Sequence, residues 1–340
     1  TGEDTLSLHD ALPISVSDIE FGVILPALST PMQARLAASS MAKALRRPLV
    51  VDDHLVRLTP SIGIAIASEL GFDATRLMCS ARVAESTCRN RGGRYMIFTQ
   101  AMADQASEDA RLEMEVIKAF NNNQLYLYLQ PQVNIADGRC ISAEALLRWN
   151  RDGVAIAPDQ LLHVLHKAGH LIDYTHWLVK SVCRMASELE QHGIDISLSL
   201  NLFAEDFADD EIVDLFELEL GFWKVRQDRL RIEIVEGSPV LVDARIRHAF
   251  VRLRELGVRL SMDDFGAGYS SLLQLRQLPV DEIKLDRAFI NQAAESKRDG
   301  AIVKSAVALA HALDLIVVAE GVETQKVLDF LADIECDLAQ

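Results

Sequence analysis

The sequence predicts an α/β fold in which eight strands close into a barrel, and two observations support this prediction. From about residue 126 onward, short runs rich in β-branched and aromatic residues alternate with longer stretches that repeat apolar residues at helical spacing. This alternation is typical of parallel α/β folds, in which helices connect successive strands. With 340 residues, the chain is also long enough for a barrel of about 250 residues and a second, smaller unit.

Eight candidate strands can be placed in this part of the chain. An Asp-Gly pair, Asp137-Gly138, lies between the first two, and such a pair favours a tight type I′ hairpin. We therefore expect the first strand to be antiparallel to the second, whereas the later connections are long enough for helical crossovers. The candidate strands are residues 126–135, 142–149, 195–202, 230–236, 259–265, 282–286 and 315–320, with a last strand that begins at Cys336.

Amphipathic helices are expected between these strands. Residues 174–192 are an example, because apolar side chains recur at helical spacing and Gly193 follows as a stop signal. In barrels of this kind, the chemistry lies at the carboxyl ends of the strands. Those ends are therefore where functional side chains are expected.

The first hundred residues predict a separate α/β unit. Its candidate strands are residues 21–26, 56–67 and 94–98, and residues 32–45 form an amphipathic helix. The predicted organisation is an unassigned segment at 1–15, a partial domain at 16–100, a helical linker at 101–114 and the barrel at 115–340.

Composition excludes several classes of function. The formal net charge of −16 argues against binding to the DNA or RNA backbone, so a nucleotide ligand would need metal ions. Five widely spaced cysteines without a Cys-x-x-Cys motif indicate buried thiols in a reducing, cytoplasmic compartment. No run of about 18 apolar residues is present, so no membrane span is predicted in this chain, although a longer parent protein could be membrane-anchored.

Acidic residues interrupt the apolar strands at positions where an unpaired charge is costly. Asp263 and Asp264 are adjacent at the end of one strand and are followed by a loop with two glycines. A single charged residue at a strand end is usually solvated or caps a helix, but several carboxylates in apolar runs are tolerable together only with cations. Oxygen ligands without clustered His or Cys indicate Mg²⁺ or Mn²⁺. The polar strand-end residues are Glu144, Asn201, Glu233 with Glu236, Asp263 with Asp264, Lys284 with Asp286, and Glu320 with Glu323.

Two basic residues accompany this acidic set. Lys284 lies on an alternating strand, where an inward ammonium could orient or deprotonate water or stabilise charge on a phosphate. Its alternative role is a structural ion pair with Asp286 or Glu320. Arg148 is four residues after Glu144, on the same side of an extended strand, and could reach a phosphate or a guanine edge.

Together these motifs resemble the signature motifs of EAL-type cyclic di-GMP phosphodiesterases, over about residues 115–340. The resemblance implies a modified TIM (β/α)8 barrel that hydrolyses one phosphodiester bond of cyclic di-GMP to give linear pGpG. It also implies a homodimer formed through this domain. The matching segments are residues 144–149, Asn201, and residues 233–236, 263–272, 283–286 and 319–324.

The resemblance also implies roles for individual residues. Two Mg²⁺ or Mn²⁺ ions would be held by Glu144, Asn201, Glu233, Asp263, Asp264 and Glu320. Lys284 would be the catalytic lysine near the attacking water, with Glu144 and Glu320 as further catalytic residues. The substrate contacts would be Gln130, Arg148 and Gln340. Glu236 would anchor the loop that starts at Asp264 and couple dimerisation to metal binding.

Both ends of the chain depart from this pattern. The chain ends at Gln340, where the family continues through its eighth strand into a final helix, so we expect an open barrel with an exposed strand edge. Residues 19–95 resemble the second half of a GGDEF (diguanylate cyclase) domain, but Ser17-Asp18-Ile19-Glu20-Phe21 replaces the glycine-rich signature. Cyclase activity is therefore not expected. Residues 1–15 indicate a truncated or non-native start, or a divergent leader.

Two alternatives to the phosphodiesterase remain open. The barrel could bind the dinucleotide without cleaving it, as a receptor or protein-interaction module. It could also be an unrelated metal-dependent barrel enzyme, such as an enolase-like one, although Arg148 and the loop after Asp264 argue against this.

Overall fold

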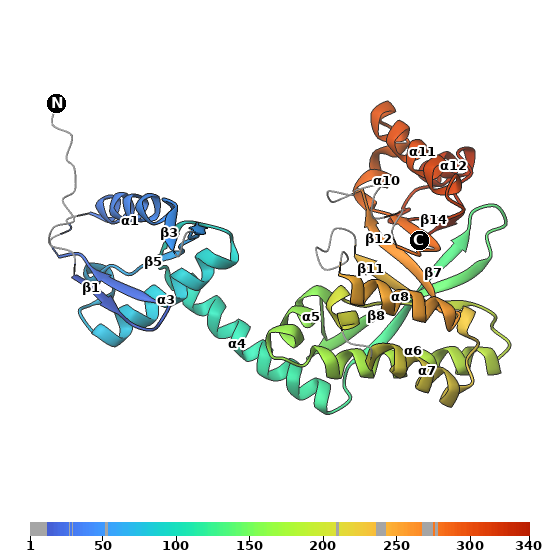
Figure 1. Ribbon diagram of the computed structural model, residues 1–340, viewed down its shortest axis with the longest axis horizontal. Coiled ribbons are helices and arrows are strands. Elements are labelled where there is room, and N and C mark those ends of the chain that lie inside the picture. The colour runs from blue at the N-terminus through green and yellow to red at the C-terminus, as the bar shows by residue number, and fades with distance from the viewer. Residues whose placement is uncertain are drawn as a thin grey trace. The chain divides into compact units, whose positions relative to one another are not determined.

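Eight strands form a closed ring in the unit Glu115–Gln340 of the computed structural model (Figure 1). The structure describes residues 12–26, 28, 30–51, 54–208, 211–235, 243–266, 275 and 278–340. We call Glu115–Gln340 the barrel unit and Thr1–Met114 the N-terminal unit. The strands of the ring are β7 (Tyr126–Asn134), β8 (Cys140–Arg151), β10 (Ser197–Asn201), β11 (Leu230–Val235), β12 (Arg259–Phe265), β13 (Glu282–Leu285), β14 (Ile316–Ala319) and β15 (Leu338–Ala339).

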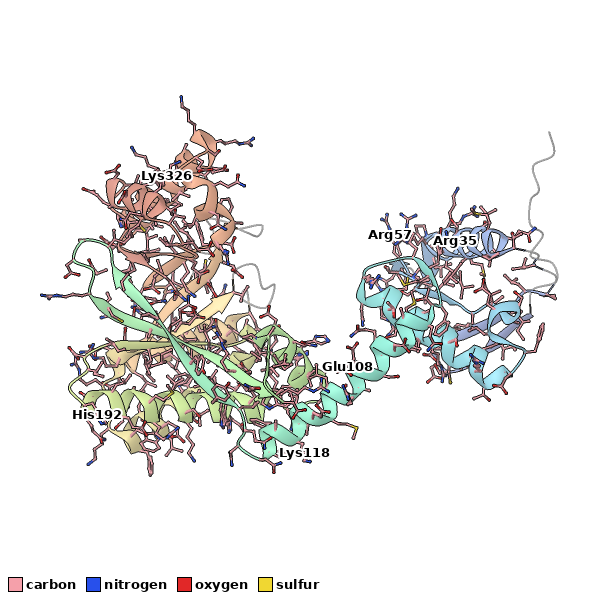
Figure 2. All side chains as sticks on the ribbon, turned by 180° about the vertical axis from the view of Figure 1, so that it is seen from behind. Arg35, Arg57, Glu108, Lys118, His192 and Lys326 are labelled. Carbon is pink, nitrogen blue, oxygen red and sulfur yellow. The ribbon has the colours of Figure 1, made fainter. Side chains whose placement is uncertain are left out.

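One strand of the ring runs against the others, as predicted. The spatial order is β8, β10, β11, β12, β13, β14, β15 and β7, and all neighbours are parallel except the two pairs that involve β7. The long strands β7 and β8 lie side by side in both views (Figures 1 and 2). The α/β barrel with an antiparallel first strand is therefore confirmed.

The predicted type I′ turn between β7 and β8 is wrong. A type I′ turn needs positive φ at both central residues, but Gly138 has φ of 69° and Asp137 is not among the described residues with positive φ. Instead, the side chain of Asn134 accepts hydrogen bonds from the amides of Ala136 and Asp137. This side-chain turn makes a longer loop in which only the glycine is left-handed.

The expected open edge at the carboxyl end is also wrong. The short strand β15 pairs with β14 on one side and with β7 on the other, so the ring closes. Asp337, the residue before β15, holds this strand next to β14, because its Oδ2 accepts hydrogen bonds from the amide of Val317 at 2.8 Å and from His311 at 2.9 Å. The strand begins two residues after the predicted Cys336, and its two residues suffice because both of its edges are paired.

Helices cover the outside of the ring. Helices α6 and α7 lie side by side (Figure 1), and Figure 2 labels His192 at the end of α6 and Lys326 near the start of α12. Phe207 of η2 and Phe250 of α8 pack edge to face, with 4.8 Å between the ring centroids. Among the described residues, the helical segments that lie wholly within the barrel unit are α5 (Pro158–Lys167), α6 (Leu171–Gln191), η2 (Ala204–Ala208), α7 (Glu211–Trp223), η3 (Gln227–Arg229), α8 (Ala244–Glu255), α10 (Arg287–Ala293), α11 (Lys297–His311) and α12 (Gln325–Asp333).

The inside of the ring is polar, because side chains alternate along each strand. On β11 the buried residues Ile232 and Ile234 face the helices, whereas Arg231 and Glu233 face inward. Arg231 reaches across β12 to Glu282 of β13 at 2.8 Å, which places both inside the ring. The sequence therefore reads as apolar strands with charged interruptions because each interruption points to the barrel axis.

The N-terminal unit has three pairs of short strands among its described residues. β1 (Leu12–Ser15) pairs with β2 (Phe21–Ile24), so the end of the segment left unassigned from sequence is a strand. The predicted strand at 56–67 is divided in two, as β4 ends at Val56 and β5 spans Ile62–Ile64; Pro60 lies between them, whereas Gly63 lies within β5. The remaining elements are α1 (Pro31–Leu45), β3 (Leu49–Val51), β4 (His54–Val56), α2 (Ala67–Leu70), α3 (Ala74–Asn90), β6 (Tyr95–Ile97) and α4 (Gln100–Asn121), which continues past Met114.

The five cysteines are free thiols, but they are not all buried. Cys88, Cys183 and Cys336 are buried, whereas Cys79 and Cys140 are exposed, which corrects the prediction for those two. Among the described residues, none of the helices combines the length and apolarity that a membrane crossing requires.

We predict that Asp337→Ala loosens the closure of the ring. The substitution leaves the amide of the buried Val317 without its acceptor, which should lower the free energy of unfolding by about 1 to 3 kcal/mol. Urea unfolding followed by tryptophan fluorescence measures this, because the three tryptophans Trp149, Trp177 and Trp223 all lie in the barrel unit.

The matched control is Asp333→Ala, which removes the same charge from an exposed position at the end of α12. This control should change the free energy of unfolding by less than about 0.5 kcal/mol. Equal losses in the two variants would contradict the role of Asp337.

Candidate functional site

A buried ammonium lies at the carboxyl ends of the strands, surrounded by carboxylates. The side chain of Lys284, on β13, is 1% exposed, and its Nζ lies 2.7 Å from Glu320, 2.8 Å from Glu233, 3.2 Å from Glu144 and 3.3 Å from Asp263. Burial alone would lower the pKa of Lys284, but the four carboxylates outweigh burial and raise it well above its usual value. Lys284 is therefore a stable ammonium that donates hydrogen bonds.

Glu144 accepts three hydrogen bonds from neighbouring side chains. Its Oε1 accepts a hydrogen bond from Asn201 at 2.7 Å, and its Oε2 accepts from Gln340 at 2.6 Å and from Lys284 at 3.2 Å. Burial works to raise the pKa of Glu144, but Lys284 and the two amides together hold it below its usual value. Glu144 is thus ionised and oriented by neighbours from three other strands or strand ends.

The pKa values of Glu233 and Glu320 are raised, in contrast to that of Glu144. Burial raises the pKa of Glu233 well above its usual value, and the negative charges of Glu144 and Asp263 add to this against the attraction of Lys284. Burial likewise raises the pKa of Glu320 to about 7. Burial is thus the main reason why Glu233 and Glu320 hold a proton more tightly than a free glutamate does, and the neighbouring carboxylates add to it.

The left-handed backbone conformation of Asp264 lets the side chains of the adjacent residues Asp263 and Asp264 lie in the same cluster. Neighbouring residues of a strand normally point to opposite faces, but Asp264 has φ of 55°, a conformation that aspartate tolerates. Its amide donates to Oδ1 of Asp263 at 3.0 Å, and ligand atoms of Asp263, Asp264 and Glu320 all lie within 4.8 Å of one another. Burial and then the charge of Asp263 raise the pKa of Asp264.

These residues fit divalent cations. Five carboxylates and one ammonium carry four net negative charges if every acid is ionised, and Oε1 of Glu233 is buried without a hydrogen-bond partner among the described residues. All the available ligand atoms are oxygens, which suits Mg²⁺ or Mn²⁺. Asp263 and Glu320 are 14% and 20% exposed, so this cluster is reached from the carboxyl ends of the strands.

The other predicted site residues have different positions. Gln340 is inside the site, where it contacts Glu144. Gln130 is exposed on β7 opposite Glu144. Arg148 is partly exposed, donates to the carbonyl of Leu147 at 2.8 Å and lies 6.0 Å from the ring centroid of Tyr128. Glu236 and residues 267–272 of the predicted loop lie outside the described residues.

Two acids at strand ends do not contact Lys284. Asp286 caps α10 by accepting from the amide of Ala288, and Glu323 pairs with Arg287 at 2.6 Å on the surface. Of the two ion pairs considered for Lys284, only the one with Glu320 is present among the described residues, and it is one of four.

Two buried polar residues beside the site, Gln132 and Ser142, were not predicted from the sequence. Gln132 lies on β7, where its side chain donates a hydrogen bond to Gln340 at 2.7 Å and accepts one from Ser142 at 2.6 Å. The alternation of β7 contains a signal, because Gln132 is two residues after Gln130 and therefore on the same face of the strand.

Comparisons with known proteins agree with this arrangement. A profile of the EAL domain family matches residues 113–340. The bifunctional diguanylate cyclase/cyclic di-GMP phosphodiesterase MucR of Pseudomonas aeruginosa is 35% identical over 323 residues, which are 94% of this chain and 47% of MucR. Cyclic di-GMP phosphodiesterase NbdA of the same organism is 30% identical over 322 residues, which are 93% of this chain and 41% of NbdA. The chain therefore spans less than half the length of these relatives.

The barrel also resembles solved structures. A structure of the PaMucR phosphodiesterase in complex with c-di-GMP matches with a TM-score of 0.63 and 36% identity. The match covers 68% of this chain and 94% of that one.

We predict that cation affinity depends on pH through Glu320. Below its pKa of about 7, Glu320 carries a proton that a cation must displace, so affinity should rise with pH through this range. Titration of the metal-free protein with Mn²⁺ should show a contribution from Glu320 of up to about a tenfold loss of affinity per pH unit below 7.

The control for this titration is Glu320→Gln, which keeps the shape of the side chain but cannot be ionised. This variant should bind Mn²⁺ more weakly at pH 8 and should lose the part of the pH dependence that comes from Glu320. If wild-type protein bound Mn²⁺ with the same affinity at pH 6 and pH 7, the role of Glu320 as a titrating cation ligand would be contradicted.

Proposed function

The chain belongs to the EAL domain family, and on this premise we propose that its barrel unit hydrolyses cyclic di-GMP to linear pGpG in bacterial second-messenger signalling. The observation that carries the proposal is the buried Lys284 with its four carboxylates, next to the cluster of Asp263, Asp264 and Glu320. The names of MucR and NbdA, both cyclic di-GMP phosphodiesterases, support it.

We propose that the acidic residues hold two Mg²⁺ or Mn²⁺ ions. When bound, the ions would neutralise the phosphate and make water more acidic. The predicted ligands Glu144, Asn201, Glu233, Asp263, Asp264 and Glu320 supply only oxygen atoms. The lowered pKa of Glu144 keeps this ligand ionised at neutral pH, and Asn201 and Gln340 hold its orientation.

The reaction adds water across one phosphodiester bond. The water oxygen bonds to phosphorus, the bond from phosphorus to the leaving ribose oxygen breaks, and that oxygen takes up a proton. Nζ of Lys284 lies 2.7 to 3.3 Å from four carboxylates, so this ammonium is placed to orient water or phosphate as a hydrogen-bond donor.

Substrate contacts are proposed for residues near the rim of the site. The guanidinium of Arg148 uses one N–H on the carbonyl of Leu147 and is partly exposed, so its other donors can reach a phosphate or a guanine edge. Gln130, exposed opposite Glu144, can contact the same ligand. Gln340 contacts Glu144, so we propose that it supports this acid as well as any substrate.

The N-terminal unit is proposed to be a partial, degenerate GGDEF-like domain. Its residues Val16 to Glu20 connect β1 and β2, and Ser17 and Asp18 stand where the signature would have glycine. The homodimer through the barrel unit and the cytoplasmic location remain expectations from the sequence.

We predict that the protein with Mg²⁺ or Mn²⁺ converts cyclic di-GMP to pGpG, as measured by chromatography of the products. Glu144→Gln should lower kcat/KM at least about a hundredfold, because the neutral amide is a poor cation ligand. The matched control is Glu323→Gln, which makes the same change at an exposed ion pair and should keep full activity.

The outcomes of this assay separate the remaining alternatives. Wild-type protein that binds cyclic di-GMP but forms no pGpG would support the receptor and overturn the phosphodiesterase. Cleavage by Glu144→Gln at the wild-type rate would overturn the assignment of Glu144 as a ligand.

We also predict that the protein does not synthesise cyclic di-GMP. Incubation with GTP and Mg²⁺ should yield none, because side chains at Ser17 and Asp18 hinder the close backbone approach that glycines allow. The hydrolysis variant Glu144→Gln should be used here, so that any product would accumulate. Accumulation of cyclic di-GMP would show that the N-terminal unit is an active cyclase.

A further inference from the structure

A chain of hydrogen bonds leads from Ser142 to Glu144 through two glutamines. Oγ of Ser142 donates to Oε1 of Gln132 at 2.6 Å, and Nε2 of Gln132 donates to Oε1 of Gln340 at 2.7 Å. Nε2 of Gln340 then donates to Oε2 of Glu144 at 2.6 Å. Ser142, Gln132 and Glu144 are at most 5% exposed, so water does not readily replace these bonds.

The direction of every bond in the chain follows from chemistry. An ionised Glu144 can only accept, so Gln340 must turn its NH₂ group toward it and its carbonyl oxygen toward Gln132. Gln132 must then present its own NH₂ group to Gln340, which leaves its oxygen for the Ser142 hydroxyl. If the amide of Gln340 turned over, two oxygen acceptors would face each other at the Glu144 carboxylate.

The antiparallel direction of β7 makes this chain possible. Gln132 lies opposite Ser142 of β8, and Val133 lies opposite Ala339 of β15. Because β7 and β15 are antiparallel, Gln340 follows Ala339 to a position beside Gln132. Gln132 therefore lies between a hydroxyl on one neighbouring strand and an amide on the other.

We propose that Gln132 is a positioning residue, which fixes the amide of Gln340 so that Gln340 always donates to Glu144. Among the described residues, the side-chain hydrogen bonds of Gln132 go to Gln340 and Ser142 and not to the carboxylates. Its effect on cation binding rests on the proposed function of the site. Its effect on the orientation of Gln340 does not.

The experiment compares Gln132→Met with wild type in the full-length chain. Methionine keeps an unbranched side chain of similar size but neither donates to Gln340 nor accepts from Ser142. Mn²⁺ affinity of the metal-free protein should fall about 10- to 100-fold, as is typical when a partner of a metal ligand is lost. The matched control is Val133→Ala, on the same strand but the opposite face, which should lower thermal stability and keep Mn²⁺ affinity within twofold.

A double variant distinguishes positioning from a general structural role. If Gln132 acts through Gln340, the variant Gln132→Met with Gln340→Met should bind Mn²⁺ no more weakly than Gln340→Met alone. If the two losses multiply, Gln132 acts independently and the proposal is overturned. Wild-type affinity in Gln132→Met would overturn it as well. Should that variant fail to fold, Ser142→Ala removes the first bond of the chain and should weaken Mn²⁺ binding in the same direction.

A second measurement needs neither cation nor substrate. In the metal-free protein, the side-chain amide protons of Gln340, assigned with Gln340→Met, should exchange slowly with solvent, and this protection should be lost in Gln132→Met. Unchanged protection would overturn the proposal. If wild type binds no Mn²⁺, the two-metal function fails, but the exchange measurement still decides the role of Gln132.

Discussion

The burial of the Lys284 ammonium among four carboxylates is the interaction on which the site of the barrel unit depends. The four carboxylates around Lys284 come from β8, β11, β12 and the residue after β14, so they meet only if those strands close into a ring. Burying any one of these charges alone would cost free energy. When they are buried together, the carboxylates still outnumber the single ammonium, so the group is net negative if every acid is ionised. An excess of negative charge of this kind suits cations, and burial is the main reason why the pKa values of Glu233 and Glu320 are raised.

Strand alternation lets the same segments build both the core and the site. Apolar residues such as Ile232 face the helices, and polar residues of the same strands face the axis, where Arg231 and Glu282 form an ion pair below the carboxylates. The antiparallel β7 adds a neutral partner, Gln132, to this interior. Gln132 is linked to Glu144 through Gln340.

Much of the site could be predicted, because charge in an apolar run is conspicuous. Glu233, Asp263 and Lys284 interrupt such runs, and the structure brings them together. Gln132 was missed because a neutral amide in a strand resembles many exposed residues, and only its partners on β8 and β15 reveal its position. The hairpin turn was mispredicted because the side chain of Asn134 competes with the preference of the Asp-Gly pair. The open edge was mispredicted because two residues of β15 are enough when both neighbours are present.

The sequence by itself determined the order of strands and helices, the antiparallel first strand and the identity of the acids, since these follow from local periodicity and from the cost of charge in apolar segments. Tertiary structure alone decided which atoms meet. The four contacts of Lys284, the left-handed turn at Asp264 and the path from Ser142 to Glu144 join residues that are far apart in the chain or depend on one backbone angle. Such contacts depend on the register between strands, which is set by closing the ring and is not written in any single segment.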